Sequence, residues 1–169
     1  MKILDTERLI LLEQTQDDAA FILALLNSPG WLKYIGERNV KTVEEAAKYI
    51  LNGAMKSYKE NGFGLYLVQL KDGGTPVGIC GIIKRPGLDQ VDIGFAFLPE
   101  HEGRGYCFES ATAVMTYARE ALGLGVVVAI TTKDNEASIR LLKKMGFDLK
   151  EKVTLPGDTE ELLLFESKP

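Results

Sequence analysis

The sequence predicts a single α/β domain spanning residues 1–169, with helices on both faces of one mixed, mostly antiparallel sheet of about six or seven strands. Three observations predict this class. The length of 169 residues suits one domain, which usually takes ~100–200 residues. Three strand-like segments joined by short turns follow one another between residues 63 and 98. A long helical segment then separates two strands across residues 91–130, which requires a parallel pair and a right-handed crossover.

The N-terminal part predicts one strand followed by two helices. Residues 9–12 are a short apolar run that we expect to be the first strand, and Asp17 then opens the first helix. We expect residues 31–38 to be irregular. Thr42 is a good N-cap for the second helix, which ends at Gly62.

The rest of the chain is expected to complete the sheet. The meander consists of strands at 63–70, 77–83 and 91–98. The pattern then predicts a helix at about 105–122, a buried strand at 126–130, a helix at 135–145, and closing strands at 147–152 and 161–165.

The composition excludes several classes of protein. A net charge of −4 argues against general nucleic-acid binding, which depends on basic side chains that neutralise phosphates. No segment approaches the ~20 apolar residues of a membrane helix, and the start has no signal-peptide pattern. The two cysteines, Cys80 and Cys107, are far apart in sequence. We therefore expect no membrane association, no metal site and a reducing cytoplasm as the location.

The predicted strand at 91–98 has two unequal faces. Large side chains occupy one face, and Asp92, Gly94 and Ala96 alternate with them on the other. A face without bulk lets a ligand approach the backbone, and it equally lets a helix pack closely. The pattern alone leaves both interpretations open.

The segment Gly103–Cys107 leads from this strand into the next helix. Its glycines permit positive φ angles, and the first N–H groups of a helix point outward with the positive end of the dipole. Such a loop suits a pyrophosphate, although a plain turn also fits. A dinucleotide-binding fingerprint would need glycine at Phe108, and no Gly-Lys-Ser/Thr run is present for a nucleotide-triphosphate loop.

These motifs resemble the GNAT superfamily of N-acetyltransferases, and within it the branch of ribosomal-protein N-terminal-alanine acetyltransferases. The superfamily loop Gln/Arg-x-x-Gly-x-Gly/Ala falls on residues 102–107, where Gly105 matches, Glu102 replaces Gln/Arg and Cys107 replaces Gly/Ala. Residues 134–147 are similar to the Asn-x-x-Ser…Gly-Phe stretch of the branch, and residues 6–11 resemble its first strand. The resemblance covers nearly the whole chain in the right order.

The resemblance implies a fold and an activity. The central parallel strands would splay and admit the pantetheine arm of acetyl-CoA, and an amine would attack the thioester directly in a ternary complex. A main-chain N–H near Phe95 would meet the oxyanion. The residues implied to bind the co-substrate are Phe95, Phe97, Leu98, Gly103, Arg104, Gly105, Tyr106, Cys107 and Asn135.

The catalytic residues implied are Ser138 and Asp92. Ser138 would protonate the leaving thiolate, since Leu142 stands where many members carry an acidic tyrosine. Asp92 would act as a base through a water. The alternatives left open are a backbone contact for Ser138, a salt bridge for Asp92 and a helix N-cap for Asn135.

Three more side chains near the loop have competing interpretations. His101 is either an exposed loop residue or a proton carrier. Cys107 should have a lowered pKa at a helix N-terminus, which invites a nucleophile, but no histidine partner is evident, so a small spacer is preferred. Glu109 is expected to be a structural residue on the helix face.

The acceptor pocket is expected from the two N-terminal helices and an aromatic-rich set of nearby residues, which consists of Tyr34, Phe63 and Tyr66 together with Arg38. Plain packing is the alternative for this stretch. The sequence leaves the acceptor open between a peptide N-terminus and a small amine, and the oligomeric state between monomer and homodimer. A rival function is a catalytically silent acyl-CoA-binding sensor, which would share the loop but lack turnover.

Overall fold

A computed structural model describes the whole chain, residues 1–169. Eight strands form one sheet in the order β1-β2-β3-β4-β5-β6-β8-β7. The strands are β1 (Lys2–Asp5), β2 (Leu9–Glu13), β3 (Leu65–Leu70), β4 (Pro76–Ile83), β5 (Asp92–Phe97), β6 (Val128–Thr131), β7 (Asp148–Val153) and β8 (Leu162–Glu166). The α-helices are α1 (Ala19–Leu26), α2 (Pro29–Tyr34), α3 (Val43–Ile50), α4 (Lys56–Asn61), α5 (Tyr106–Glu120) and α6 (Glu136–Lys144).

The sheet is antiparallel except between β5 and β6. These two strands pair at a single position, Asp92 with Val128, where the Val128 N–H donates to the Val91 carbonyl at 2.9 Å. Beyond that point the strands separate, while β5 stays paired with β4 and β6 with β8. The predicted mixed sheet with a central, splayed parallel pair is therefore confirmed.

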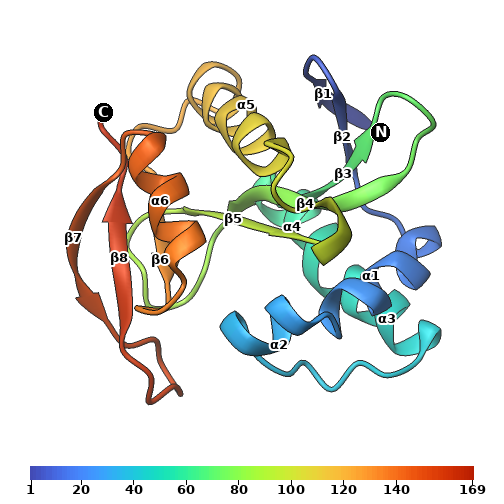
Figure 1. Cartoon of the computed structure of the whole chain (residues 1–169), viewed down its shortest axis with the longest axis horizontal. Coiled ribbons are helices and arrows are strands. Elements are labelled where there is room, and N and C mark those ends of the chain that lie inside the picture. The colour runs from blue at the N-terminus through green and yellow to red at the C-terminus, as the bar shows by residue number, and fades with distance from the viewer.

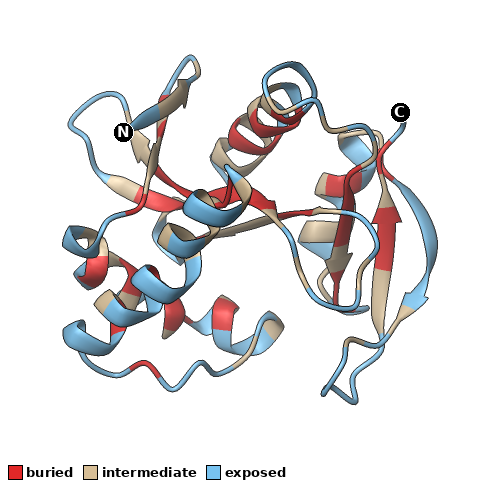
Figure 2. Cartoon of the chain, turned by 180° about the vertical axis from the view of Figure 1, so that it is seen from behind, coloured by how far each residue is buried: buried red, intermediate tan, exposed pale blue.

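Helices cover both faces of the sheet, as predicted. Figure 1 shows α5 and α6 in front of the strands, with α4 behind them. One core cluster joins α5 to β2, β3, β4 and β5, and a second, smaller cluster joins α1, α2 and α3 to Ile79 of β4. Seen from behind in Figure 2, the buried positions of α5 line the side of the helix that meets the sheet.

Two elements differ from the sequence prediction. The sheet has eight strands because a short edge strand, β1, pairs with β2; its four residues include no fully buried position, so they carry no strong pattern. The stretch expected to be irregular, residues 31–38, includes most of α2. This helix begins at Pro29, a first-turn position where the backbone N–H that proline lacks would have no partner within the helix. Trp31 of α2 is buried.

The long second helical region is not uniform. Thr42 caps α3, and its side chain accepts from the Glu45 N–H, as the sequence predicted. A π-helical turn, η2 (Leu51–Met55), then connects α3 to α4, and Gly62 ends α4 with a φ of +79°. No helix in the structure has the length and apolar character to span a bilayer.

Candidate functional site

The candidate site begins at the fork between β5 and β6. Side chains of β5 alternate as expected: Phe95 and Phe97 pack in the cluster with α5, while Ala96 and Leu98 meet the N-terminal helices. At Gly94, a Cβ would come within 2.8 Å of the Ile83 side chain. The neighbours at Gly94 are side chains of β3 and β4 rather than of a helix, so the two interpretations of this face stay open.

The loop after β5 has the backbone shape that the sequence predicted. Gly103 and Gly105 both adopt left-handed conformations, with φ of +75° and +82°, and Gly105 is the N-cap of α5. The Glu109 N–H donates to the Gly105 carbonyl at 3.0 Å, so the N–H groups of the first turn lie free at the helix start. This arrangement offers donors and the positive dipole end to an anion.

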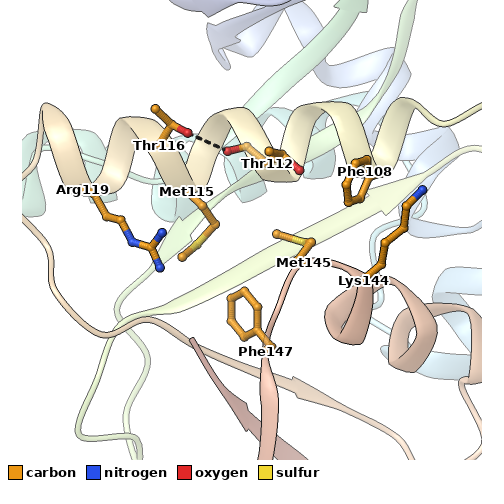
Figure 3. Close-up of a pocket in the computed structure, with 8 residues that line it drawn as sticks. All are labelled: Phe108, Thr112, Met115, Thr116, Arg119, Lys144, Met145 and Phe147. Carbon is orange, nitrogen blue, oxygen red and sulfur yellow. Dashed lines mark hydrogen bonds between the residues drawn. The ribbon is translucent and has the colours of Figure 1, made fainter. Parts of the chain in front are cut away.

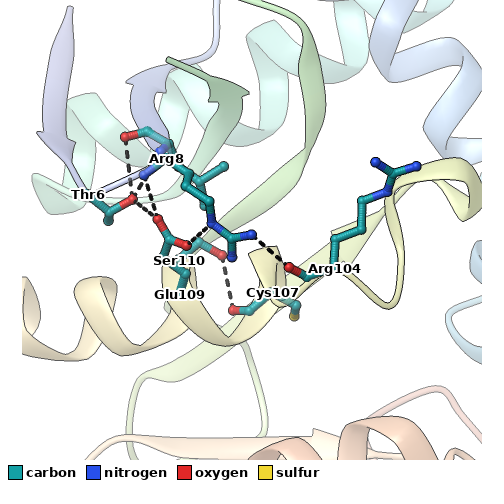
Figure 4. Close-up of polar contacts among 7 residues, drawn as sticks. Thr6, Arg8, Arg104, Cys107, Glu109 and Ser110 are labelled. Atoms are coloured by element: carbon teal, nitrogen blue, oxygen red, sulfur yellow. Dashed lines mark hydrogen bonds and ion pairs between the residues drawn. The ribbon is translucent and has the colours of Figure 1, made fainter. Parts of the chain in front are cut away.

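A polar cluster fixes this loop to the N-terminal strand region (Figure 4). The Glu109 carboxylate accepts from the Thr6 hydroxyl at 2.6 Å, from the Arg8 backbone N–H at 2.8 Å and from Arg8 Nε at 2.7 Å. Burial opposes ionisation of Glu109, but these hydrogen bonds outweigh it and lower its pKa. The structural role predicted for Glu109 is confirmed; its partners were missed because they lie about a hundred residues away in sequence and no local pattern links them.

Cys107 differs from its expected chemistry. Burial, with further contributions from Cys80 and Glu102, raises the pKa of its thiol well above the ordinary value. The lowered pKa expected from the helix N-terminus is therefore wrong, because loss of solvent outweighs the dipole. A protonated thiol is a poor nucleophile, which favours the small-spacer interpretation.

Asp92 lies at the closed end of the fork. Its side chain is 1% exposed, and its two oxygens accept from Nε and Nη2 of Arg85, each at 3.2 Å. Burial raises the pKa of Asp92, while the Arg85 charge and hydrogen bond partly offset that rise. The salt bridge left open by the sequence is present, and a base role for Asp92 stays a prediction.

Asn135 and Ser138 meet at the start of α6. Asn135 is the N-cap, and its side-chain oxygen accepts from the Ser138 N–H at 3.3 Å. The capping role for Asn135 is thus confirmed. The half-buried Ser138 contributes its backbone N–H to the cap, and its hydroxyl makes no hydrogen bond within the protein. Leu142, one turn further on, is buried in the core.

The four residues expected to form an acceptor pocket do not come together. Tyr66 is 1% exposed; it stacks on Tyr58 at 5.6 Å between ring centroids and meets Tyr117 edge-on at 6.3 Å. Phe63 is buried in the same cluster. For these two residues the packing alternative is correct, because their side chains point to the α5 face of the sheet.

The other two acceptor candidates lie with the N-terminal helices. Arg38 is exposed and its guanidinium lies 6.0 Å from the ring centroid of Trp31. Tyr34 is half-buried beside Lys33. A role for Tyr34 and Arg38 in acceptor binding stays a prediction.

A cavity of about 250 Å³ lies between α5 and the α6–β7 segment (Figure 3). Its lining consists of Phe108, Thr112, Met115, Thr116, Arg119, Lys144, Met145 and Phe147. The Lys144 ammonium lies 4.1 Å from the Phe108 ring centroid, and no carboxylate lines the cavity. No motif in the sequence indicated this groove.

Comparison with known proteins matches this architecture. A family model described as an acetyltransferase (GNAT) domain matches residues 8–148. The uncharacterized N-acetyltransferase YoaA of Bacillus subtilis is 34% identical over 146 residues, covering 86% of this chain and 82% of YoaA.

Two solved structures share the fold along at least 95% of their lengths. An acetyltransferase from Agrobacterium tumefaciens superimposes with a TM-score of 0.83 at 24% identity, covering 100% of this chain and 95% of that one. RimL, a ribosomal L7/L12 alpha-N-protein acetyltransferase solved with coenzyme A, gives a TM-score of 0.84 at 18% identity, covering 99% and 98%.

The family match contains the fork, the glycine loop and the start of α6, and leaves only Thr6 of the polar cluster outside. It begins at Arg8, includes the fork and the glycine loop, and extends to the first residue of β7. The chain is therefore an acyltransferase that belongs to the GNAT family of acetyltransferases.

Proposed function

We propose that the enzyme binds acetyl-CoA across the fork and the Gly103–Cys107 loop and transfers its acetyl group to an amine by direct attack in a ternary complex. One observation carries the proposal. The left-handed glycine loop at the start of α5 follows β5 after a short 3-10 turn, η3 (Pro99–His101), and β6, the parallel partner of β5, has separated from it. An anion site therefore lies next to an open strand edge. CoA needs both, because its pyrophosphate is joined to the pantetheine arm, which contains two amides.

The pantetheine arm is proposed to pair with the free edge of β5. Beyond Asp92, the β5 backbone has strand partners only on the β4 side. Backbone N–H and C=O groups on the other edge need partners when they are buried, and the two amides of pantetheine supply them. Phe95, Phe97 and Leu98 are the residues of β5 and its end that we assign to this contact.

The pyrophosphate is proposed to lie on the loop. Gly103 and Gly105 allow the phosphates to reach the backbone, and the first-turn N–H groups of Tyr106 and Cys107 act as donors. Arg104 is exposed and adds a positive charge at the loop. No step requires a metal ion.

The adenosine end of CoA is proposed to reach the groove of Figure 3. Phe108 stands in the first turn of α5, next to the loop, and offers an aromatic face to a purine. Lys144 and Arg119 give the groove a positive charge that suits the 3′-phosphate.

For the chemical step, the acceptor amine is the nucleophile rather than Cys107, whose thiol has a raised pKa. As the amine attacks and the C–S bond breaks, Ser138 is proposed to donate its hydroxyl proton to the departing thiolate and to regain a proton from solvent, into which the amine releases its own. The absence of an internal partner for that hydroxyl supports this role. Asn135 is proposed to hold this helix start and to contact the pantetheine.

The acceptor is proposed to be a peptide N-terminus or a small amine. The similarity to RimL, named for an alpha-N-protein acetyltransferase, favours the peptide. A silent acyl-CoA sensor is the second candidate. Two observations favour it: the Asp92 carboxylate is paired with Arg85, and the buried Leu142 has no proton to donate to the thiolate. We place the enzyme in the cytoplasm.

Ligand-dependent melting tests the binding half of the proposal. Acetyl-CoA and CoA should raise the melting temperature, since a ligand that binds only the folded state stabilises it by mass action. ATP and NAD, which carry phosphates but no pantetheine, should raise it less at the same concentrations. Equal shifts from ATP and CoA would contradict a pantetheine site in the fork.

A further inference from the structure

We propose that Thr6, Arg8 and Glu109 form a latch that holds the Gly103–Gly105 loop in its left-handed shape, and that Arg8 is a positioning residue for the CoA pyrophosphate. This inference rests on the proposed function, because it concerns the same loop. It adds residues from outside the loop and a role for the turn between β1 and β2.

Arg8 contacts the loop and the following helix at once (Figure 4). Its Nη1 donates to the Arg104 carbonyl at 2.9 Å, between the two left-handed glycines. Its Nε donates to Glu109 at 2.7 Å, one turn into α5. Its guanidinium also lies 4.6 Å from the ring centroid of Tyr106. One side chain thus spans the loop, the first helical residue and the first turn.

The loop has few other contacts that define its shape. Residues 102–105 are exposed, and a Cβ added at Gly103 would meet nothing within 4 Å. Glycine has the largest backbone freedom of any residue, so ordering this loop on binding costs free energy. A latch that orders the loop beforehand removes that cost and strengthens binding.

The latch also sets the charge at the anion site. A free carboxylate on Glu109 would repel a phosphate at the helix start, but it is engaged by Thr6 and by two N–H groups of Arg8. Arg8 Nη2 makes no hydrogen bond within the protein and would lie 3.2 Å from a Cβ on Gly105. A positive group with free N–H donors therefore stands beside the loop backbone.

The test compares two acetyl donors with the full-length enzyme. In Arg8→Met, the KM for acetyl-CoA should rise about tenfold, the size of one charge-assisted hydrogen bond. With S-acetylpantetheine, which lacks the pyrophosphate, kcat/KM should equal that of the wild type. Glu109→Gln should also raise the KM for acetyl-CoA and leave kcat/KM for S-acetylpantetheine unchanged. The double variant should have the same KM for acetyl-CoA as either single variant, because both substitutions break the same latch.

Arg8→Lys distinguishes the hydrogen bonds of the latch from the effect of the positive charge alone. A lysine keeps the positive charge but cannot donate to Glu109 and to the Arg104 carbonyl in the same planar fork, so its KM for acetyl-CoA should stay raised. Recovery of the wild-type KM would overturn the latch and leave a charge effect alone. Thr6→Val, which removes a single hydroxyl, should raise the same KM by a smaller factor and serves if the Arg8 variants fold poorly.

The control is Lys150→Gln, which removes an exposed ion pair of similar length, 2.9 Å, between β7 and β8. It should change neither donor's kinetics. Equal losses with both donors in Arg8→Met, or an unchanged KM for acetyl-CoA, would overturn the proposal while leaving wild-type turnover intact. Failure of the proposed function looks different: the wild type itself would neither bind CoA by calorimetry nor consume acetyl-CoA.

Discussion

The carboxylate of Asp92 lies 3.2 Å from the guanidinium of Arg85, at the only position where β5 and β6 pair. This ion pair joins the β4–β5 loop to the closed end of the fork. Because Asp92 is almost fully buried and Arg85 partly so, the pair holds the point from which the two strands diverge. The opening that we assign to the pantetheine arm starts at this pair.

Removing Arg85 should destabilise the fold. In Arg85→Gln the buried carboxylate loses its partner, and the free energy of unfolding at pH 7 should fall by about 2–3 kcal/mol, below the usual ~3–5 because the Arg85 side chain is 29% exposed. Urea denaturation measures this loss. Lys133→Gln, which removes an exposed ion pair with Glu161, should cost about 0–1 kcal/mol.

The same variant should change the pH dependence of stability. Folding raises the pKa of Asp92, so the folded state holds this proton more tightly, and stability falls as pH rises from the unfolded pKa through the folded one. Without Arg85 the folded pKa rises further. The loss in Arg85→Gln should therefore be smaller at pH 4 than at pH 7, and a loss independent of pH would contradict the buried ion pair.

Gly105 should be needed for CoA and Gly123 should not. Both have left-handed backbones, with φ of +82° and +66°, at opposite ends of α5. Valine at either position should cost about 1–2 kcal/mol of stability. Only Gly105→Val should abolish CoA binding in calorimetry, because its side chain would fill the proposed phosphate space and meet Arg8. Equal CoA affinity in the two variants would place the anion site elsewhere.

Alanine variants of Ser138 and Asn135 should have different defects, the first in turnover and the second in stability. Ser138→Ala should lower kcat by about 10²-fold, with acetyl-CoA affinity nearly unchanged, if the hydroxyl protonates the thiolate. Its melting temperature should hold, since the cap bond uses the Ser138 backbone N–H. Asn135→Ala should lose about 1 kcal/mol of stability with the cap. A Ser138→Ala enzyme with wild-type kcat would leave solvent as the acid.

The sequence predicted most of the fold because its signals are local. Hydrophobic periodicity located α5, the alternation along β5 separated its two faces, and paired glycines marked the loop. Where the prediction failed, the deciding contacts were either weak or non-local. The edge strand β1 has no buried residue, and α2 is a short helix that begins with a proline and a glycine, two poor helix formers.

The candidate site was less predictable, for a physical reason. Spacing placed Gly103, Gly105, Asn135 and Ser138 at helix starts, because such signals depend on neighbouring residues. Other features depend on contacts between distant segments. The register of β3 decides which face of the sheet Tyr66 occupies, and burial in the folded protein raises the pKa of the Cys107 thiol. The pairing of Arg8 with Glu109 joins the turn between β1 and β2 to α5 across 101 residues, a separation at which one sequence carries no signal.

The most direct test of the account is acetyl transfer itself. Free-thiol release from acetyl-CoA should be followed across a panel of N-terminal peptides and small amines, with mass spectrometry of both the acceptor and the enzyme. We expect CoA release only with an amine present, one acetyl group added to that amine and no acetyl group on the protein. Tight CoA binding without turnover on any acceptor, or an acetylated Cys107, would contradict it.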